Sequence, residues 1–153
     1  MEDKYPQIGL VINGPNILLS KFDISLEDIL YALNDIGRIV VGKVVINYEF
    51  SSNLLKSIID SGLESVMVNG RVDVAVAVEG MKIIYNPRIN VLALATRDAH
   101  FMPLVFEAKR MGKDVIVIAP EKKVSEALQN IADKTIELLP PKPTTTLYKV
   151  KVD

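Results

Sequence analysis

The sequence contains no cysteine and a single histidine, His100. The absence of cysteine excludes disulfides, thiolate metal sites and cysteine nucleophiles together. A metal ion, if the protein binds one, therefore has only oxygen ligands or His100 available. A formal net charge of −1 provides no overall attraction to nucleic acid, so any phosphate binding has to come from a local basic patch.

Long apolar runs are also missing. None approaches the roughly 18 to 20 residues that a membrane span needs, although the hydrophobic fraction of 49% and the mean hydropathy of +0.25 are high for a soluble protein. The first apolar run is short, ends at Asn13 and lacks the preceding basic region of a signal peptide. We therefore expect a cytoplasmic protein with no membrane partner, whose apolar residues cover both faces of a sheet.

A chain of 153 residues has the usual size of one domain, and its pattern alternates between strands and helices. Runs rich in Val and Ile predict strands, each followed by residues that favour turns. The predicted strands span 7–12, 38–47, 65–68, 89–96, 114–120 and 135–139. Serine caps predict helices that begin near Ser25, near Ser51 or Ser52, and near Ser125, and one further helix spans 101–111.

One segment, residues 72–85, is compatible with either a strand or a helix. Its first residues alternate strictly in polarity, as a strand does, yet the strands on either side leave no other room for a crossover connection. We therefore predict a helix there. The resulting fold is α/β, with three layers (α/β/α) and a mostly parallel central sheet of five to six strands.

The C-terminal segment differs in composition from the rest of the chain. We place the domain at residues 1–139 and a proline-containing linker at 140–153. Within this tail Tyr148, Val150 and Val152 alternate with lysines, which is typical of a half-exposed extra strand. We expect this strand to pair with a sheet edge, and pairing with a second subunit would make a homodimer.

Polar side chains follow the predicted strands at their carboxyl ends, where ligands bind in parallel sheets. They are Asn13 and Asn16 after the first strand, Asp98 and His100 after the fourth, and Asp73 at the start of the helix between them. Acidic groups gathered in this way repel one another unless a cation such as Mg²⁺ or Mn²⁺ neutralises them, and a bound metal can activate water against a phosphodiester.

Each of these residues also has an ordinary structural explanation. Asp73 and Asp98 are good residues for the first turn or the cap of a helix, Asn13 and Asn16 form turns readily, and His100 can be a capping residue. Other chemistries find less support, because the chain lacks the dinucleotide fingerprint, the P-loop and the Gly-x-Ser-x-Gly elbow. A group of basic residues is compatible either with a basic rim or simply with the solvated face of a helix: Lys109, Arg110, Lys113, Lys122 and Lys123.

The order of motifs resembles that of the NYN domain family, a branch of the PIN-like nucleases with stand-alone members in archaea and bacteria. The matching segments are INGPNIL at 12–18, VDVAVAVEGMKIIY at 72–85, ATRDAHFMPLV at 95–105 and SEALQNIAD at 125–133, and the match runs in order over residues 7–139. The resemblance implies a PIN-like, Rossmann-like fold and a ribonuclease that depends on Mg²⁺ or Mn²⁺. It assigns family carboxylates to Asp73 and Asp98, the motif asparagine to Asn16 and the small hydroxyl residue to Thr96.

Two positions depart from the family pattern, because Asn13 and His100 stand where that family has Asp. We expect the change to weaken Mg²⁺ binding, since Mg²⁺ prefers oxygen ligands and imidazole suits Mn²⁺ or Zn²⁺ better. The expected catalytic residues are Asp73, Asp98, Asn13 and His100. The expected metal ligands are Asp98, Asp73, His100 and the supporting acid Glu79. The expected RNA contacts are Asn16, Thr96, Arg97 and Ser125.

Two functions follow from these expectations. One is a divalent-metal-dependent ribonuclease with an altered acidic site. The other is a catalytically inactive relative that binds RNA or a protein through the same crevice.

Overall fold

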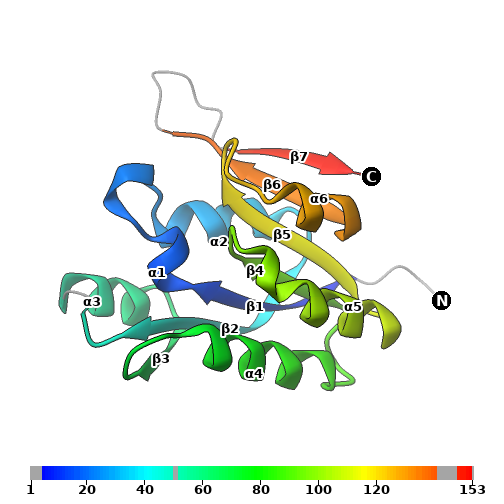
Figure 1. Ribbon diagram of the computed structural model, residues 1–153, viewed down its shortest axis with the longest axis horizontal. Coiled ribbons are helices and arrows are strands. Elements are labelled where there is room, and N and C mark those ends of the chain that lie inside the picture. Colours follow the sequence, from blue (N-terminus) through cyan, green and yellow to red (C-terminus); the bar gives the residue numbers. More distant parts are fainter. Residues whose placement is uncertain (1–4, 50–51, 141–147, 153) are drawn as a thin grey trace.

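The computed structural model describes residues 5–49, 52–140 and 148–152. In this part of the chain a seven-stranded sheet has the order β3-β2-β1-β4-β5-β6-β7 (Figure 1). The strands are β1 Gln7–Asn13, β2 Arg38–Asn47, β3 Glu64–Val68, β4 Val91–Ala95, β5 Asp114–Pro120, β6 Lys134–Leu138 and β7 Tyr148–Val152. All neighbouring strands are parallel except β6 and β7, which are antiparallel. The prediction of a mostly parallel sheet is confirmed, and the seventh strand is the extra strand predicted in the tail.

Helices cover both faces of the sheet and complete the three predicted layers (Figure 1). One face carries α1 Gly14–Ile17, α2 Leu26–Asn34 and α3 Ser52–Asp60, and the other carries α4 Asp73–Ile84, α5 Met102–Arg110 and α6 Glu126–Ile131. Two short 3₁₀ turns, η1 Ser20–Phe22 and η2 Ala99–Phe101, lie before α2 and α5. Among the residues that the structure describes, no helix is both long enough and apolar enough to cross a bilayer.

The alternation of side chains along each strand explains the two cores. In β1, Ile8, Leu10 and Ile12 point into the layer of α1 to α3, whereas Val11 points into the layer of α4 to α6. Every residue of β4 is buried, as expected for a central parallel strand that is covered on both faces. The continuous apolar runs in the sequence are therefore the signature of a sheet without a solvent face.

The ambiguous segment 72–85 is a helix, as predicted. Strand β3 lies at one edge of the sheet, and β4 lies beyond β2 and β1. The chain must therefore cross two strands between them, and α4 makes this crossing while packing on β1, β2 and β4. Topology overrides the local alternation of this segment.

The motif Asn13 to Asn16 was predicted to be a turn, and this prediction is wrong. The residues after Asn13 form one turn of α-helix, α1, with Pro15 in its first turn. Proline favours this position because its fixed φ angle is helical and its missing N–H has no helical partner there. The short helix begins directly at the end of β1.

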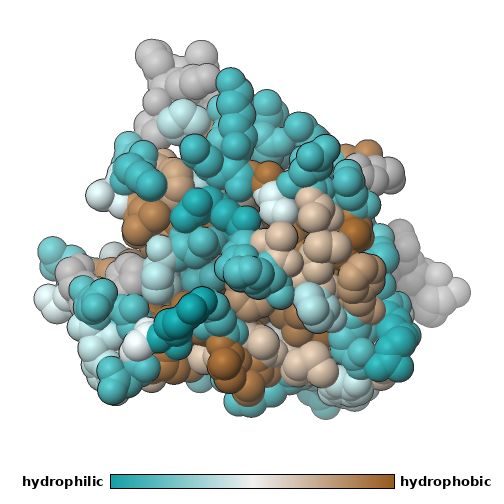
Figure 2. Space-filling view, viewed as in Figure 1, coloured by the Kyte–Doolittle hydropathy of each residue, from teal (hydrophilic) through white to brown (hydrophobic). Residues whose placement is uncertain are grey.

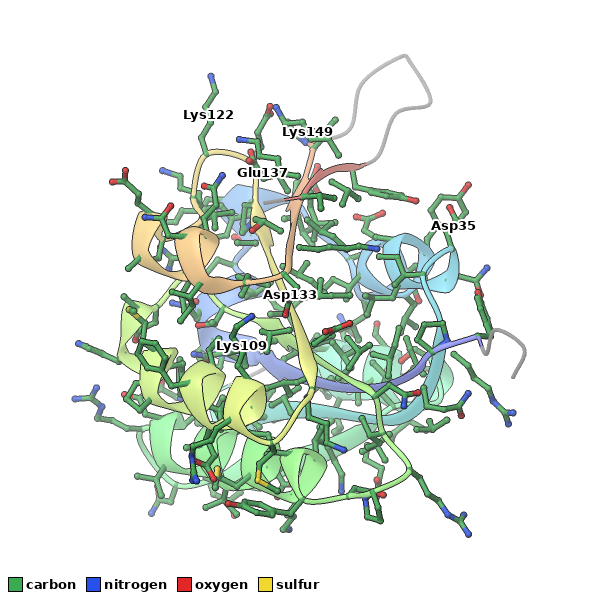
Figure 3. The ribbon with its side chains drawn as sticks, turned by 90° about the vertical axis from the view of Figure 1, so that its right-hand side faces the viewer. Asp35, Lys109, Lys122, Asp133, Glu137 and Lys149 are labelled. Atoms are coloured by element: carbon green, nitrogen blue, oxygen red, sulfur yellow. The ribbon has the colours of Figure 1, made fainter. Side chains whose placement is uncertain are left out.

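The strand predicted in the C-terminal tail is present as β7, and its partner is β6 of the same chain. Lys149 lies 3.1 Å from Glu121, Lys151 lies 2.8 Å from Glu137, and the Tyr148 hydroxyl donates to Asp35 at 2.8 Å. Figure 3 shows Glu137 and Lys149 on the neighbouring strands β6 and β7. A homodimer and a domain boundary at residue 139 stay predictions, and most of the linker, residues 141–147, lies outside the described residues.

Glu137 gives this edge a testable dependence on pH. The carboxylate is 4% exposed, and burial alone would raise its pKa. The hydrogen bond from Lys151, the backbone N–H of Lys122 and the charge of Lys149 outweigh burial and hold the pKa of Glu137 below its ordinary value. Its stabilising contribution is therefore complete above the ordinary pKa and is lost as the pH falls through the lowered one.

Glu137→Gln is expected to lower the free energy of unfolding at neutral pH by about 1–3 kcal/mol, because Lys151 loses its charged partner. The loss should shrink as the pH falls through the lowered pKa of Glu137, where the carboxylate of the parent becomes protonated. Urea denaturation at several pH values measures both effects. Glu126→Gln, at an exposed residue, is the matched control. A pH-independent difference between parent and variant would contradict this explanation.

Candidate functional site

The candidate site lies where the strand order reverses. Strands β1 and β4 are neighbours at the centre of the sheet, with β2 on one side and β5 on the other. A crevice forms at the carboxyl ends of strands at such a position. Here it is a pocket of about 400 Å³, which we call the carboxyl-end pocket. Its lining residues are Asn13, Pro15, Asn16, Asn47, Glu49, Gly70, Arg71, Val72, Asp73 and Asp98. In Figure 2 hydrophilic residues gather between α1 and the start of α4.

Asn13, the last residue of β1, brings an unsatisfied oxygen to this pocket. The residue is 3% exposed, and its Nδ2 donates to the Thr96 hydroxyl at 3.5 Å. Its Oδ1 is buried and has no hydrogen-bond partner among the described residues. Because buried polar groups are nearly always paired, an unpaired carbonyl oxygen on a pocket wall is a candidate ligand for a bound group.

Thr96 organises the residues around Asn13. It follows β4 directly and is fully buried. Its hydroxyl donates to Oδ1 of Asn16 at 3.2 Å and accepts the backbone N–H of Asp98 at 3.1 Å. Burial removes this hydroxyl from contact with RNA. Thr96 instead fixes the ends of β1 and β4 relative to each other.

Arg97 and Asn16 form the rim of the pocket. Oδ1 of Asn16 accepts the backbone N–H of Arg97 at 2.5 Å, and the backbone oxygen of Asn16 accepts Nε of Arg97 at 2.8 Å. The Arg97 guanidinium also lies 5.0 Å from the centre of the Phe22 ring, within the range of a cation–π contact. These contacts hold the guanidinium in place, and among the described residues its terminal nitrogens have no hydrogen-bond partner.

Two carboxylates line the same pocket. Oδ1 of Asp98 accepts the backbone N–H of His100 at 2.9 Å and lies 3.0 Å from Nδ1 of the same histidine. Oδ2 of Asp98 has no hydrogen-bond partner among the described residues. Asp73, at the start of α4, has one oxygen 2.7 Å from Nη2 of Arg71. The structure thus brings Asp73 and Asp98 together with Asn13, as the strand-end pattern predicted.

Three other predicted site residues lie elsewhere. The His100 side chain is 80% exposed and does not line the pocket, although it contacts Asp98. Glu79 is buried between β2 and α4, where its oxygens lie 3.2 Å from Lys82 and 3.8 Å from Lys43. Ser125 caps α6, and its hydroxyl accepts the backbone N–H of Leu128. The structure accounts for Glu79 and Ser125 by these local interactions.

The pocket also contains residues that the sequence did not indicate. Glu49 adds a third carboxylate, and its loop is held by Asn47, which accepts the Glu49 backbone N–H at 3.1 Å and donates to Gly70 at 3.4 Å. Arg71 adds a cation. Asn47 ends a predicted strand, so the strand-end rule applied to β2 would have found this loop. Applying the rule in this way requires knowing that β2 lies beside β1 in the sheet.

The donor atoms suit a hard divalent ion in their chemistry. Asn13 Oδ1 and the carboxylates of Asp98, Asp73 and Glu49 are oxygen ligands, which Mg²⁺ and Mn²⁺ prefer. No group of three acidic or histidine side chains in the described ranges is close enough together to hold a metal ion. A metal ion bound here would therefore need the amide oxygen of Asn13 in addition to one or two carboxylates.

Comparison with known proteins agrees with this geometry. The family model for the NYN domain matches residues 7–139. The protein MJ0482 of Methanocaldococcus jannaschii, described as uncharacterized, is 43% identical over 132 residues, which is 86% of this chain and 55% of that protein. The chain thus spans about half the length of this relative. The chain belongs to the NYN domain family, within the PIN-like superfamily.

Proposed function

We propose that this NYN domain is a divalent-metal-dependent ribonuclease that cleaves single-stranded RNA in the carboxyl-end pocket. The observation that carries the proposal is the unpartnered, buried Oδ1 of Asn13, a residue that lines one pocket with Asp73 and Asp98. Membership of the family supports a nuclease of the PIN-like type. Asn13 ends β1 and Asp98 lies shortly after β4. Thr96 fixes these two residues relative to each other, because its hydroxyl binds both.

The residues present suggest a division of roles. Asp98 and Asn13 would hold Mg²⁺ or Mn²⁺, and Asp73 would complete the oxygen ligands. When bound, the ion supplies Lewis-acid activation of water and neutralises charge on the phosphate. Arg71 and Arg97 lie at the pocket or its rim, where guanidinium groups can bind the phosphates on either side of the cleaved bond.

A second function, an inactive RNA-binding module, is favoured by one specific observation. The described residues hold no preassembled group of three acidic or histidine ligands, and amide and imidazole groups replace two family carboxylates. Such a pocket has less negative charge with which to bind a cation. RNA would then bind to the arginines at the rim without being cut.

The decisive test is Asp98→Asn. If the domain is a nuclease, this change should lower Mn²⁺-dependent cleavage of a fluorescent single-stranded RNA by at least about 100-fold, the scale for losing one group that stabilises transition-state charge. Asp60→Asn is the matched control, because Asp60 pairs with Lys56 on the exposed side of α3. Mn²⁺ should also raise the melting temperature of the parent more than that of Asp98→Asn.

Two outcomes would count against the nuclease. One is cleavage that persists in chelator or in Asp98→Asn. The other is RNA binding by the parent with no cleavage at any Mg²⁺ or Mn²⁺ concentration, which would establish the inactive module.

A further inference from the structure

A second pocket lies at the opposite ends of the strands. We call it the amino-end pocket; it has a volume of about 420 Å³. Its lining residues are Gln7, Arg38, Val40, Val41, Asn86 and Arg88. Gln7 begins β1 and Asn13 ends it, so the amino-end and carboxyl-end pockets are about 20 Å apart along this strand. The amino-end pocket therefore does not belong to the site described above.

Among the described residues, no acidic side chain in the lining compensates the positive charge of this pocket. Arg38 at the start of β2 and Arg88 in the loop after α4 line it, and no acidic residue does. Within the described ranges neither guanidinium has an ion pair or a hydrogen bond. By contrast Arg71, Arg97 and Arg110 each bind a protein oxygen. Two unpaired guanidinium groups from separate elements thus converge on one hollow.

Strand β2 has an uncovered edge beside this pocket. Strand β2 pairs with β3 only from Lys43 onward, so residues 38–42 have β1 on one side and no strand on the other. The register with β1 also shifts here, because Ile8 pairs with Ile39 and Gly9 with Val41. Val40 is left unmatched and is 40% exposed. In the described part of the chain, this stretch of β2 is therefore an open strand edge next to the valines that line the pocket.

Asn86 contributes a neutral donor to the same place. Its Oδ1 accepts the backbone N–H of Arg88 at 2.9 Å, which fixes the amide beside the arginine. Its Nδ2 has no partner among the residues that the structure describes. The pocket therefore combines two cationic forks, an amide donor and valine side chains, and its volume lies in the usual range for small-molecule sites.

We propose that the amino-end pocket binds a phosphate group, carried either by a free nucleotide or by the 5′ end of an RNA strand. Arginine forks bind phosphate through paired hydrogen bonds, and two forks from different elements match a group with several charged oxygens better than a single carboxylate. Val40 and Val41 offer the apolar contact that a sugar or base needs. The inference goes beyond the proposed function, because binding here requires neither metal nor cleavage.

The test uses nuclear magnetic resonance of the full chain, labelled with nitrogen-15, in chelator so that cleavage plays no part. Inorganic pyrophosphate and a short 5′-phosphorylated RNA are titrated in separate experiments, and the same RNA with a 5′-hydroxyl is the comparison. The side-chain Nε–Hε signals of Arg38 and Arg88 should shift in a saturable manner. A shift with pyrophosphate identifies a free phosphate ligand, and one that requires the phosphorylated RNA identifies an RNA end.

Variants make the assignment specific. Arg38→Gln and Arg88→Gln should each weaken binding about tenfold, the effect of losing one charge-assisted hydrogen-bonding partner. The single variants Lys56→Gln and Arg110→Gln each remove the same charge from an exposed residue outside this pocket and should bind as the parent does. The amide spectrum of each variant reports whether it is folded.

Three results would overturn the proposal. The first is the absence of arginine shifts with all three probes. The second is equal affinity of the parent and both arginine variants. The third is saturable binding of an acidic peptide such as oligo-glutamate to these arginines without any response to phosphate.

Discussion

Asn13→Asp is expected to raise Mg²⁺-dependent cleavage of single-stranded RNA by at least about tenfold, which corresponds to about 1.4 kcal/mol in the activation barrier. The new carboxylate would stand at the end of β1, where Oδ1 of Asn13 now lies unpartnered. A charged oxygen ligand there increases the affinity of the pocket for a hard cation. Adding His100→Asp should contribute less, because the His100 side chain is 80% exposed and does not line the pocket.

The stability of Asn13→Asp relative to the parent should depend strongly on Mg²⁺. Without metal, a buried carboxylate near Asp98 loses hydration and is repelled, so the variant should be less stable than the parent in chelator. With Mg²⁺ it should gain more stability than the parent does. Thermal melts in chelator and in Mg²⁺ measure both halves of the pattern. Asn53→Asp, at an exposed residue of α3, controls for the change in charge.

A folded Asn13→Asp variant that ignores Mg²⁺ and leaves RNA intact would refute the metal site at this pocket. The inactive RNA-binding module would then be the better description.

Gly14→Ala is expected to destabilise the protein by about 2 kcal/mol, in the usual range for overpacking. A Cβ atom on Gly14 would lie 2.6 Å from the backbone oxygen of Val45 and 2.8 Å from the Ile46 side chain. Backbone cannot move aside as a side chain does, so α1 would have to shift away from β2. Because α1 carries Asn16, the same change should also weaken RNA binding.

Gly80→Ala is the matched control. Its Cβ would also meet an atom at 2.6 Å, but that atom is the end of the Leu104 side chain, which can change rotamer. Alanine favours a helix over glycine by about 1 kcal/mol, which offsets the crowding. Chemical denaturation of both variants measures the difference. Equal destabilisation by the two substitutions would show that the backbone contact at Gly14 has no special cost.

Much of the fold could be predicted because its signals are local or topological. Apolar runs located the strands, and the helix-capping residues Ser25 and Asp28 located the start of α2. The helix at α4 could be predicted only by considering the path between strands, since its own pattern fits a strand equally well. The helical turn α1 was missed because its glycine and proline are typical of turns, while its contact with β2 is not visible in the sequence.

The candidate site could be predicted in part, for a geometric reason. The strand-end rule located Asn13 and Asp98, because their strands are neighbours. It could not locate Glu49, since that needed the position of β2. Glu79 was expected to be a metal ligand together with Asp73. It lies six residues later, which puts it about 9 Å further along α4 and on another side of the helix. There it pairs with lysines.

The order of the strands has a consequence for biosynthesis. Asn13 and Thr96 touch although 83 residues separate them, and β1 receives its second neighbour only when β4 arrives. A growing chain therefore exposes one unpaired edge of β1 until β4 has left the ribosome, which favours aggregation during this interval. The carboxyl-end pocket cannot exist before Asp98 emerges, so under the proposed function a nascent chain would carry no complete centre with which to cut the message being translated.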